Sequence, residues 1–285
     1  MKNLIKTLMT QKQPLVFSEI SQRMDGSFEE LRQMASPEIQ MRIKNNDLWL
    51  WSHGQTSSEH LSWLCEEDVL WFDEVHSTNS VAAQLSVQRG FSGVVVAGYQ
   101  TAGRGRLQRT WHSDPQKNIL MSLVFKPSNL EPSRAARTTL LWSAALADEL
   151  GLWVKWPNDL LDAQGRKVAG LLAELSLSNN RVQHIVLGIG LNVNQTSFSE
   201  TIPNPSSLKL VFNTDFDKAS LIERIVKRLR AVDLNDSLEL WRRRSAMTGK
   251  VVSVQGKEGR LDGIREDGAL IVDGEVILAG DVSLV

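Results

Sequence analysis

The chain has 285 residues, a formal net charge of −1 at pH 7 and an apolar fraction of 42%. This length allows two or three domains with a sizeable core, and the near-zero charge argues against a general nucleic-acid or membrane-surface binder. The single cysteine, Cys65, excludes an internal disulfide framework and a cysteine zinc site, and we expect it to be buried. No signal-peptide pattern or bilayer-length apolar run is found, so a cytoplasmic protein is predicted.

Residues 1–60 have the pattern of a small module with three short helices and a β-hairpin. Ser27 followed by Glu30 is a capping box that predicts one of the helices, and a short strand is expected at 15–17. Segments 40–44 and 48–52 flank an Asn-Asn-Asp turn, which is typical of a hairpin. This order resembles a winged helix-turn-helix.

The charge of this module is balanced. Its seven basic residues are matched by seven acidic ones, and the expected recognition helix begins with Glu29 and Glu30, which would face a polyanion. DNA affinity depends on neutralising phosphates. Two alternatives therefore stay open: the module binds DNA, or it supports the structure or a homodimer.

The next segments are expected to be a linker at 55–64, a strand at 69–72 and a helix at 80–89. The string Ser77-Thr78-Asn79 precedes that helix. On local sequence alone, these three residues are most simply helix-capping residues.

A polar loop lies between two expected strands, 93–97 and 118–125, and contains the string Gly103-Arg104-Gly105-Arg106-Leu107-Gln108-Arg109-Thr110-Trp111. Guanidinium groups offer forked donors to phosphate or carboxylate, and glycines let the backbone approach a ligand closely. The loop therefore indicates an anion-binding site, with a solvated basic loop as the alternative.

This string resembles the ligand-binding loop of the biotin protein ligases. These enzymes activate biotin as an adenylate and transfer it to a lysine of a carrier protein. The family pattern is Gly-Arg-Gly-Arg-x-Gly-Arg-x-Trp, and the chain departs from it only at Gln108, where the family has glycine. The resemblance implies that Ser77, Thr78, Asn79 and Gln100 bind the ureido head of biotin, which suits hydroxyls that can donate or accept.

The string Lys155-Trp156-Pro157-Asn158-Asp159 also matches the family. A lysine in an apolar strand is costly to bury unless an anion meets it. Together with this burial cost, the resemblance implies that Lys155 is the key cation. On the local sequence alone, a lysine snorkelling from a strand edge is the alternative.

Strands 167–174 and 186–193 match the next two family strands. In the family, a glycine at the position of Gly170 leaves room for the ligand, and an asparagine at the position of Asn192 contacts the adenylate. The pair Gly188 and Gly190 lacks the third glycine of a dinucleotide fingerprint, and it indicates a ligand or another backbone at close approach. No P-loop string is present.

The rest of the chain completes three predicted parts. A core helix is expected at 132–150, a loop at 194–214, amphipathic helices at 217–232 and 237–245, and β segments at 250–254, 260–264, 269–272 and 275–278. The predicted class is α/β (α+β): a central mixed β-sheet catalytic domain packed with helices at 64–246, a winged-helix-like module at 1–60, and a C-terminal SH3-like barrel at 247–285.

The resemblance implies a two-step reaction with biotin and ATP as substrates. The biotin carboxylate attacks the α-phosphorus of ATP to give biotinyl-5′-AMP, and a lysine of biotin carboxyl carrier protein, an acetyl-CoA carboxylase subunit, then displaces AMP. Lys155, Arg104 and Arg106 are expected to neutralise the reacting anions, with Mg²⁺ carrying the remaining charge. No residue is expected to ligate a metal by itself.

The expected biotin-binding residues are Ser77, Thr78, Asn79, Gln100, Arg104, Gly105, Arg106, Lys155 and Gly170. The expected adenylate-binding residues are Gly103, Arg109, Trp111, Asn158 and Asn192. For Trp111, packing within the loop is the alternative to packing on adenine. Two other functions stay open: a DNA-binding repressor that uses the ligase as a sensor, and a lipoate or octanoate ligase.

Overall fold

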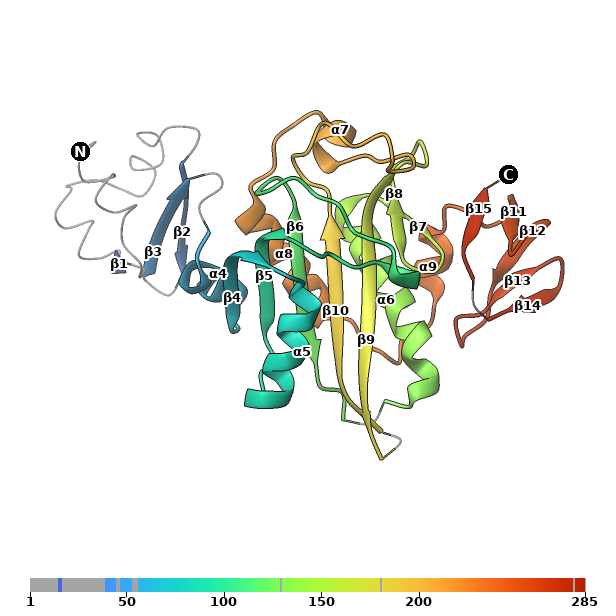
Figure 1. Ribbon diagram of the computed structural model, residues 1–285, viewed down its shortest axis with the longest axis horizontal. Coiled ribbons are helices and arrows are strands. Elements are labelled where there is room, and N and C mark those ends of the chain that lie inside the picture. Colours follow the sequence, from blue (N-terminus) through green and yellow to red (C-terminus); the bar gives the residue numbers. More distant parts are fainter. Residues whose placement is uncertain are drawn as a thin grey trace.

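The computed structural model describes residues 15–16, 39–44, 47–52, 56–128, 130–179, 181–278 and 280–284. A seven-stranded sheet organises it, with strand order β4-β5-β6-β10-β9-β8-β7 (Figure 1). In that order, the strands are Val69–Val75, Val94–Gln100, Ile119–Phe125, Arg181–Leu191, Lys167–Ser178, Asp159–Leu161 and Trp153–Lys155. Within this sheet only β4 and β5 are parallel, and helix α5 (Thr78–Arg89) makes the crossover that a parallel pair requires.

Alternation along the strands gives the sheet two different faces. Side chains at odd and even positions point to opposite sides. One face packs against α6 (Ala135–Leu150) and α8 (Lys218–Arg230) in the main core, which holds alternate residues of the strands, such as Val94, Val96, Leu123 and Leu187. The other face packs Val95, Val124 and Val186 against Ala82 of α5. Beyond the amino-terminal end of α5, this second face of the sheet borders a cavity.

Several expected elements are confirmed with small changes of boundary. Helix α6 follows a 3-10 turn at Pro132–Arg134 and ends at Gly151, whose φ of 67° is the left-handed conformation that glycine favours. Helix α8 begins after Asp217, whose carboxylate accepts from Ser220 N at 2.9 Å, and helix α9 spans Glu239–Arg244. Cys65 is buried, as expected.

Two local expectations were wrong, and one expected helix begins slightly earlier. The expected linker contains helix α4 (Ser58–Cys65), which buries Leu61 and Leu64 and is capped by the Ser57 hydroxyl. The expected loop at 194–214 contains a short helix, α7 (Leu208–Phe212), capped in the same way by Ser207. Helix α5 begins two residues before position 80, at Thr78. In the first two cases a serine N-cap precedes a short apolar segment, and the polar composition of the surrounding residues led us to expect a loop.

The C-terminal residues form a five-stranded antiparallel sheet beside α9 and β7 (Figure 1). Its order is β14-β13-β12-β11-β15, with strands Glu275–Ile277, Leu270–Val272, Lys257–Ile264, Val251–Val254 and Val282–Leu284. The last of these strands was not predicted. Trp156 Nε1 donates to the carbonyl of Gly268 at 3.1 Å, which ties this sheet to the central domain.

Near the amino terminus, the expected hairpin is confirmed by β2 (Ile39–Lys44) and β3 (Asp47–Ser52), which pair antiparallel. A short strand, β1 (Leu15–Val16), pairs with β3. The three helices expected in residues 1–60 lie outside the described residues. Within the part of the chain that is described, no helix combines the length and the apolarity needed to span a membrane.

Lys218, at the start of α8, is an almost fully buried ammonium. Its Nζ donates to the carbonyl of Gln116 at 2.7 Å and lies 5.8 Å from the centroid of the Trp71 ring. Burial lowers the pKa of Lys218 to about 8, opposed by Asp217 and assisted by Lys117. Gln116 in turn donates its N–H to Gly98 at 2.9 Å, so Lys218 anchors the end of the arginine loop, residues 101–117.

We expect the free energy of unfolding to depend on pH through Lys218. Its folded-state pKa of about 8 is below the ordinary value of about 10.4, so the unfolded chain binds the proton more tightly. Between those two pH values stability rises with pH, by at most about 1.4 kcal/mol per pH unit. Lys218→Met should remove this rise in urea denaturation, and the exposed-site variant Lys250→Met should keep it. An equal rise in both variants contradicts the assignment.

Candidate functional site

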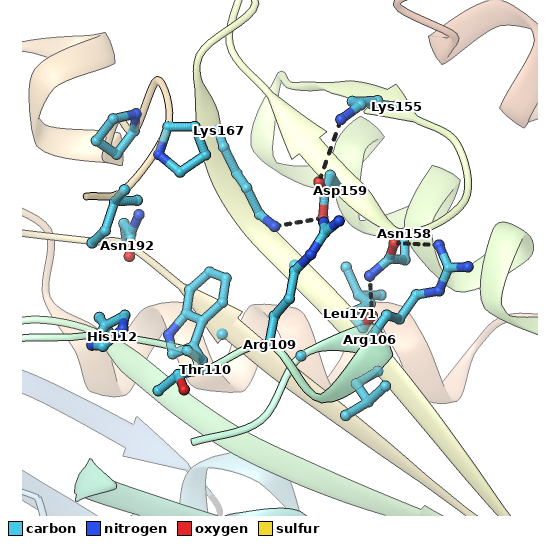
Figure 2. A pocket seen from close by; sticks show the side chains of 18 of the residues that line it. Arg106, Arg109, Thr110, His112, Lys155, Asn158, Asp159, Lys167, Leu171 and Asn192 are labelled. Carbon is cyan, nitrogen blue, oxygen red and sulfur yellow. Dashed lines mark hydrogen bonds and ion pairs between the residues drawn. The ribbon is translucent and has the colours of Figure 1, made fainter. Parts of the chain in front are cut away.

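A cavity of about 840 Å³ lies on the sheet face that α5 leaves uncovered. The arginine loop, strands β7 to β10, a loop after β10 and the C-terminal sheet all contribute to its lining (Figure 2). The structure brings together thirteen of the fourteen predicted site residues here: Ser77, Thr78, Asn79, Gln100, Arg104, Gly105, Arg106, Arg109, Trp111, Lys155, Asn158, Gly170 and Asn192. Gly103 instead lines an adjoining cavity of about 320 Å³ that shares Gln100 and Trp111 with the first.

The deep end of the cavity, formed by Thr78, Asn79 and Gln100, is polar and uncharged, and the fully buried Ser122 contacts two of these residues. Gln100 Oε1 accepts from the backbone N–H of Thr78 at 2.7 Å and from its hydroxyl at 3.1 Å. Ser122 Oγ lies 2.7 Å from Thr78 Oγ1 and 2.6 Å from Asn79 Oδ1. Ser77, at the helix N-cap, makes no side-chain capping bond. The side chains of Thr78 and Asn79 therefore serve this network rather than the cap.

Ser122 was missed by the sequence reading. It lies in an otherwise apolar strand and is completely buried. A lone hydroxyl among apolar strand residues is the signal that could have identified it, because a buried polar group needs a partner.

The arginine loop faces this cavity with three guanidinium groups, each of which contacts a carboxylate. Arg104 pairs with Glu174 at 3.1 Å and Arg106 with Asp281 at 3.6 Å, and Arg109 also pairs with Asp281. Arg106 further donates to Asn158 Oδ1 at 3.4 Å and to the carbonyl of Gly280 at 3.2 Å. The C-terminal sheet thus reaches the cavity, which the sequence did not predict.

Two lysines that line the same cavity flank one carboxylate. Lys155 Nζ lies 3.9 Å from Asp159, and Lys167 Nζ lies 2.7 Å from it (Figure 2). The expected anion partner of Lys155 is therefore present within the chain itself. Lys167 was missed as a site residue, although it begins a strand that is apolar for the next several positions.

Trp111 lies flat against glycines of the sheet rather than in solvent. A Cβ on Gly190 would lie 2.3 Å from Trp111 Cε2, and one on Gly170 would lie 3.1 Å from Cζ3. A Cβ on Gly188 would lie 2.2 Å from Asn79 Oδ1. The strand glycines therefore make room for the chain's own side chains, where a ligand or backbone was expected.

Trp111 also has a buried polar atom without a hydrogen-bond partner among the described residues. This atom is Nε1, and Lys167 Nζ lies 5.5 Å from the centroid of the Trp111 ring. Contact with a nucleotide stays a prediction.

Gln108, where the family pattern has glycine, has a backbone conformation that glycine favours. Its φ is 57° and that of Leu107 is 52°, both in the left-handed region that glycine adopts at lower cost. The loop therefore keeps the backbone path that suits glycine.

A roof loop, residues 198–205, closes the cavity over β9. It contributes Phe198, Thr201, Ile202, Pro203, Asn204 and Pro205 to the lining. Lys167 N donates to the carbonyl of Asn204 at 2.8 Å, and Asn192 Nδ2 donates to the carbonyl of Ser206 at 2.9 Å. Asn192 Oδ1 is buried and has no partner among the described residues. The sequence indicated only a loop here, although its apolar residues and two prolines were a signal for a packed cover.

The described residues contain no group of three or more histidine, cysteine, aspartate or glutamate side chains that could hold a metal ion. The carboxylates that line the cavity, Asp159 and Asp281, both contact cationic side chains.

Comparisons with known proteins agree on one family of relatives. The family model described as the Biotin/lipoate A/B protein ligase family matches residues 71–192. The biotin--[acetyl-CoA-carboxylase] ligase of Mycobacterium tuberculosis is 32% identical over 242 residues, which cover 74% of this chain and 87% of that protein. The bifunctional ligase/repressor BirA of Bacillus spizizenii is 34% identical over 170 residues, or 56% of this chain and 52% of that protein. The chain spans about half the length of the BirA proteins of two Bacillus species.

The same likeness extends to three dimensions. The solved biotin protein ligase from Aquifex aeolicus in complex with biotin and ATP has a TM-score of 0.61 and 29% identity. The match covers 76% of this chain and 98% of that one. It supports the fold of a central mixed sheet packed with helices.

Gly190→Ala should force the Trp111 ring off the sheet. Overpacking of this kind costs about 1–3 kcal/mol of unfolding free energy, and the same substitution made in a Trp111→Ala background should cost much less. Chemical denaturation of the four proteins measures both effects. Gly263→Ala is the matched control, because its Cβ would meet nothing within 4 Å. An equal cost with and without Trp111 would mean that the ring does not occupy this place.

Proposed function

This chain belongs to the biotin protein ligase family, and we propose that it activates biotin with ATP to biotinyl-5′-AMP and transfers biotin to a lysine of a biotin carboxyl carrier protein. The observation that carries the proposal is the composition of one cavity. Its deep end offers neutral donors and acceptors, and five cations line the remainder: Arg104, Arg106, Arg109, Lys155 and Lys167. Biotin has the same two-part chemistry, with a neutral ureido head and a carboxylate tail.

In the first step, a carboxylate oxygen of biotin attacks the α-phosphorus of ATP, and the bond to pyrophosphate breaks. The two reactants repel each other because both are anionic. Lys155, Arg104 and Arg106 would neutralise the carboxylate and the α-phosphate, and Lys167 is added to this set because it lies beside the same carboxylate as Lys155. Mg²⁺, when bound, would accompany the ATP phosphates and carry part of their charge.

The adenylate would be held between the arginine loop and the roof loop. Trp111 Nε1 and Asn192 Oδ1 are a buried donor and a buried acceptor without partners among the described residues, and they suit the edge of an adenine or a ribose. Asn158, Gly103 and Arg109 would complete this end. Apolar roof residues such as Phe198 and Ile202 would keep water from the mixed anhydride.

In the second step, the amine of the carrier lysine attacks the acyl carbon of the anhydride, and AMP leaves with the bonding electrons. The loops must then open on the carrier side without releasing the adenylate. The chain supplies no covalent nucleophile in this scheme.

The predicted division into three parts belongs to the same proposal. Residues 64–246 would form the catalytic domain, 1–60 a winged-helix-like module, and 247–285 an SH3-like barrel. The five antiparallel strands at 251–284 support the last of these. Asp281 would give this part a direct role in placing the loop arginines.

The ligase proposal predicts that the protein, given biotin and ATP, releases pyrophosphate and labels a carrier domain. Lys155→Met and Lys167→Met should each lower the rate of pyrophosphate release by about 10²–10³-fold, since each removes a charge that stabilises the transition state. Lys257→Met, at an exposed site in β12, is the control. Competition between biotin and lipoate separates this function from a lipoate or octanoate ligase. Absence of both pyrophosphate release and labelling rejects the proposal.

A DNA-binding repressor is the second candidate, and the hairpin of β2 and β3 favours it because a winged helix requires one. A relative bearing the name bifunctional ligase/repressor adds to this. The expected result is retardation of the protein's own upstream DNA in a gel shift, increased by biotin with ATP. Binding should weaken steeply with salt. No retardation at low salt rejects a repressor and leaves the ligase proposal untouched.

A further inference from the structure

Glu174 contacts two residues that line the cavity but has no part in the reaction proposed above. On β9, Gly170, Leu172 and Glu174 alternate onto the same face of the sheet, and the first two line the cavity. The Glu174 carboxylate accepts from Asn79 Nδ2 at 2.6 Å and from Arg104 Nη2 at 3.2 Å. It therefore touches one residue of the deep end and one residue of the arginine loop.

The Glu174 carboxylate determines how the Asn79 amide is turned. An ionised carboxylate only accepts hydrogen bonds, so the NH₂ group of Asn79 must face it. Asn79 Nδ2 also donates to the carbonyl of Leu172 at 3.3 Å, and Asn79 Oδ1 then faces Ser122, which donates to it at 2.6 Å. Turning the amide over would set its oxygen against a carboxylate and a carbonyl, and such facing acceptors are costly in a buried site.

The same carboxylate holds Arg104 at the edge of the cavity. The Arg104 side chain is 47% exposed, and its other polar contact is with Ser80 Oγ of α5, at 3.3 Å. An ion pair this exposed adds little to stability. Its effect is on position, because it keeps the guanidinium beside the residue that orients Asn79.

We infer that Glu174 is a positioning residue that couples recognition of the neutral head group at Asn79 to the placement of Arg104. The inference rests on the proposed biotin site. Asn79 and Arg104 donate to the same carboxylate. A ligand that displaces either side chain therefore changes the hydrogen bond or ion pair between Glu174 and the other. The contributions of Asn79 and Arg104 to the binding free energy should therefore be coupled, although the two side chains do not bond to each other.

A double-mutant cycle tests this coupling. Biotin dissociation constants are measured by titration calorimetry for Asn79→Ala, Arg104→Ala and the double variant, first with Glu174 in place and then with Glu174→Gln. With Glu174 present, the fold-change in the dissociation constant of the double variant should differ from the product of the two single fold-changes by at least about threefold. This exceeds the deviation expected for independent sites. In the Glu174→Gln background the fold-change of the double variant should agree with that product within about twofold. The reason is that the glutamine amide has one acceptor oxygen and no charge with which to bind both side chains.

Controls separate coupling from a merely structural role. Glu275→Gln, an exposed carboxylate of β14, should leave the dissociation constants unchanged. Glu174→Asp keeps the charge on a shorter side chain and should give intermediate coupling between Asn79 and Arg104. If the Glu174→Gln variant does not fold, the Asp variant replaces it in the test, and undiminished coupling there overturns the inference. Multiplicative effects with Glu174 present, or coupling that persists in the Gln background, also overturn it and leave the ligase proposal standing. Failure of the unaltered protein to bind biotin overturns both.

Discussion

Positive charge concentrated around one cavity is the constraint on which the site depends. Like charges at short range repel, so they can be held together only where opposite charges lie between them. Here three carboxylates do this: Glu174 from β9, Asp159 from β8 and Asp281 from the C-terminal sheet. The cations are thus oriented before an anionic ligand arrives. A phosphate or a carboxylate that entered would take over contacts that already have the right geometry, which would limit the reorganisation that binding requires.

The sheet supplies the frame for this arrangement through its two faces. Branched residues on the face toward α6 and α8 form the continuous core, which fixes strand positions. On the opposite face, glycines replace side chains just where Asn79 and Trp111 cross the strands. The same backbone therefore serves as core on one side and as the floor of a cavity on the other. A single methyl group on Gly188 or Gly190 would disturb the second function while leaving the first in place.

The C-terminal sheet belongs to the same system. Its contacts with Trp156 and Arg106 tie it to the strand end and to the loop that carry the cations. Charge near the cavity is therefore balanced partly by residues far away in the sequence. A shift of this sheet would move Asp281 and so change the positions of Arg106 and Arg109, because both arginines contact its carboxylate.

The sequence by itself determined the strands of the central sheet other than β8, the long helix α6, the hairpin near the amino terminus and thirteen of the residues that line the cavity. These follow from local periodicity and from motifs in which neighbouring residues act together, such as the arginine loop and the string around Lys155. Only the tertiary structure decided which carboxylate meets which cation, because Glu174 and Asp281 are brought to Arg104 and Arg106 by sheet pairing and by docking of the C-terminal sheet. The roles of Ser122 and Lys167 and the packing of Trp111 on Gly190 likewise depend on contacts between strands. No local pattern encodes such contacts, since they arise from the register of strands that are far apart in the chain.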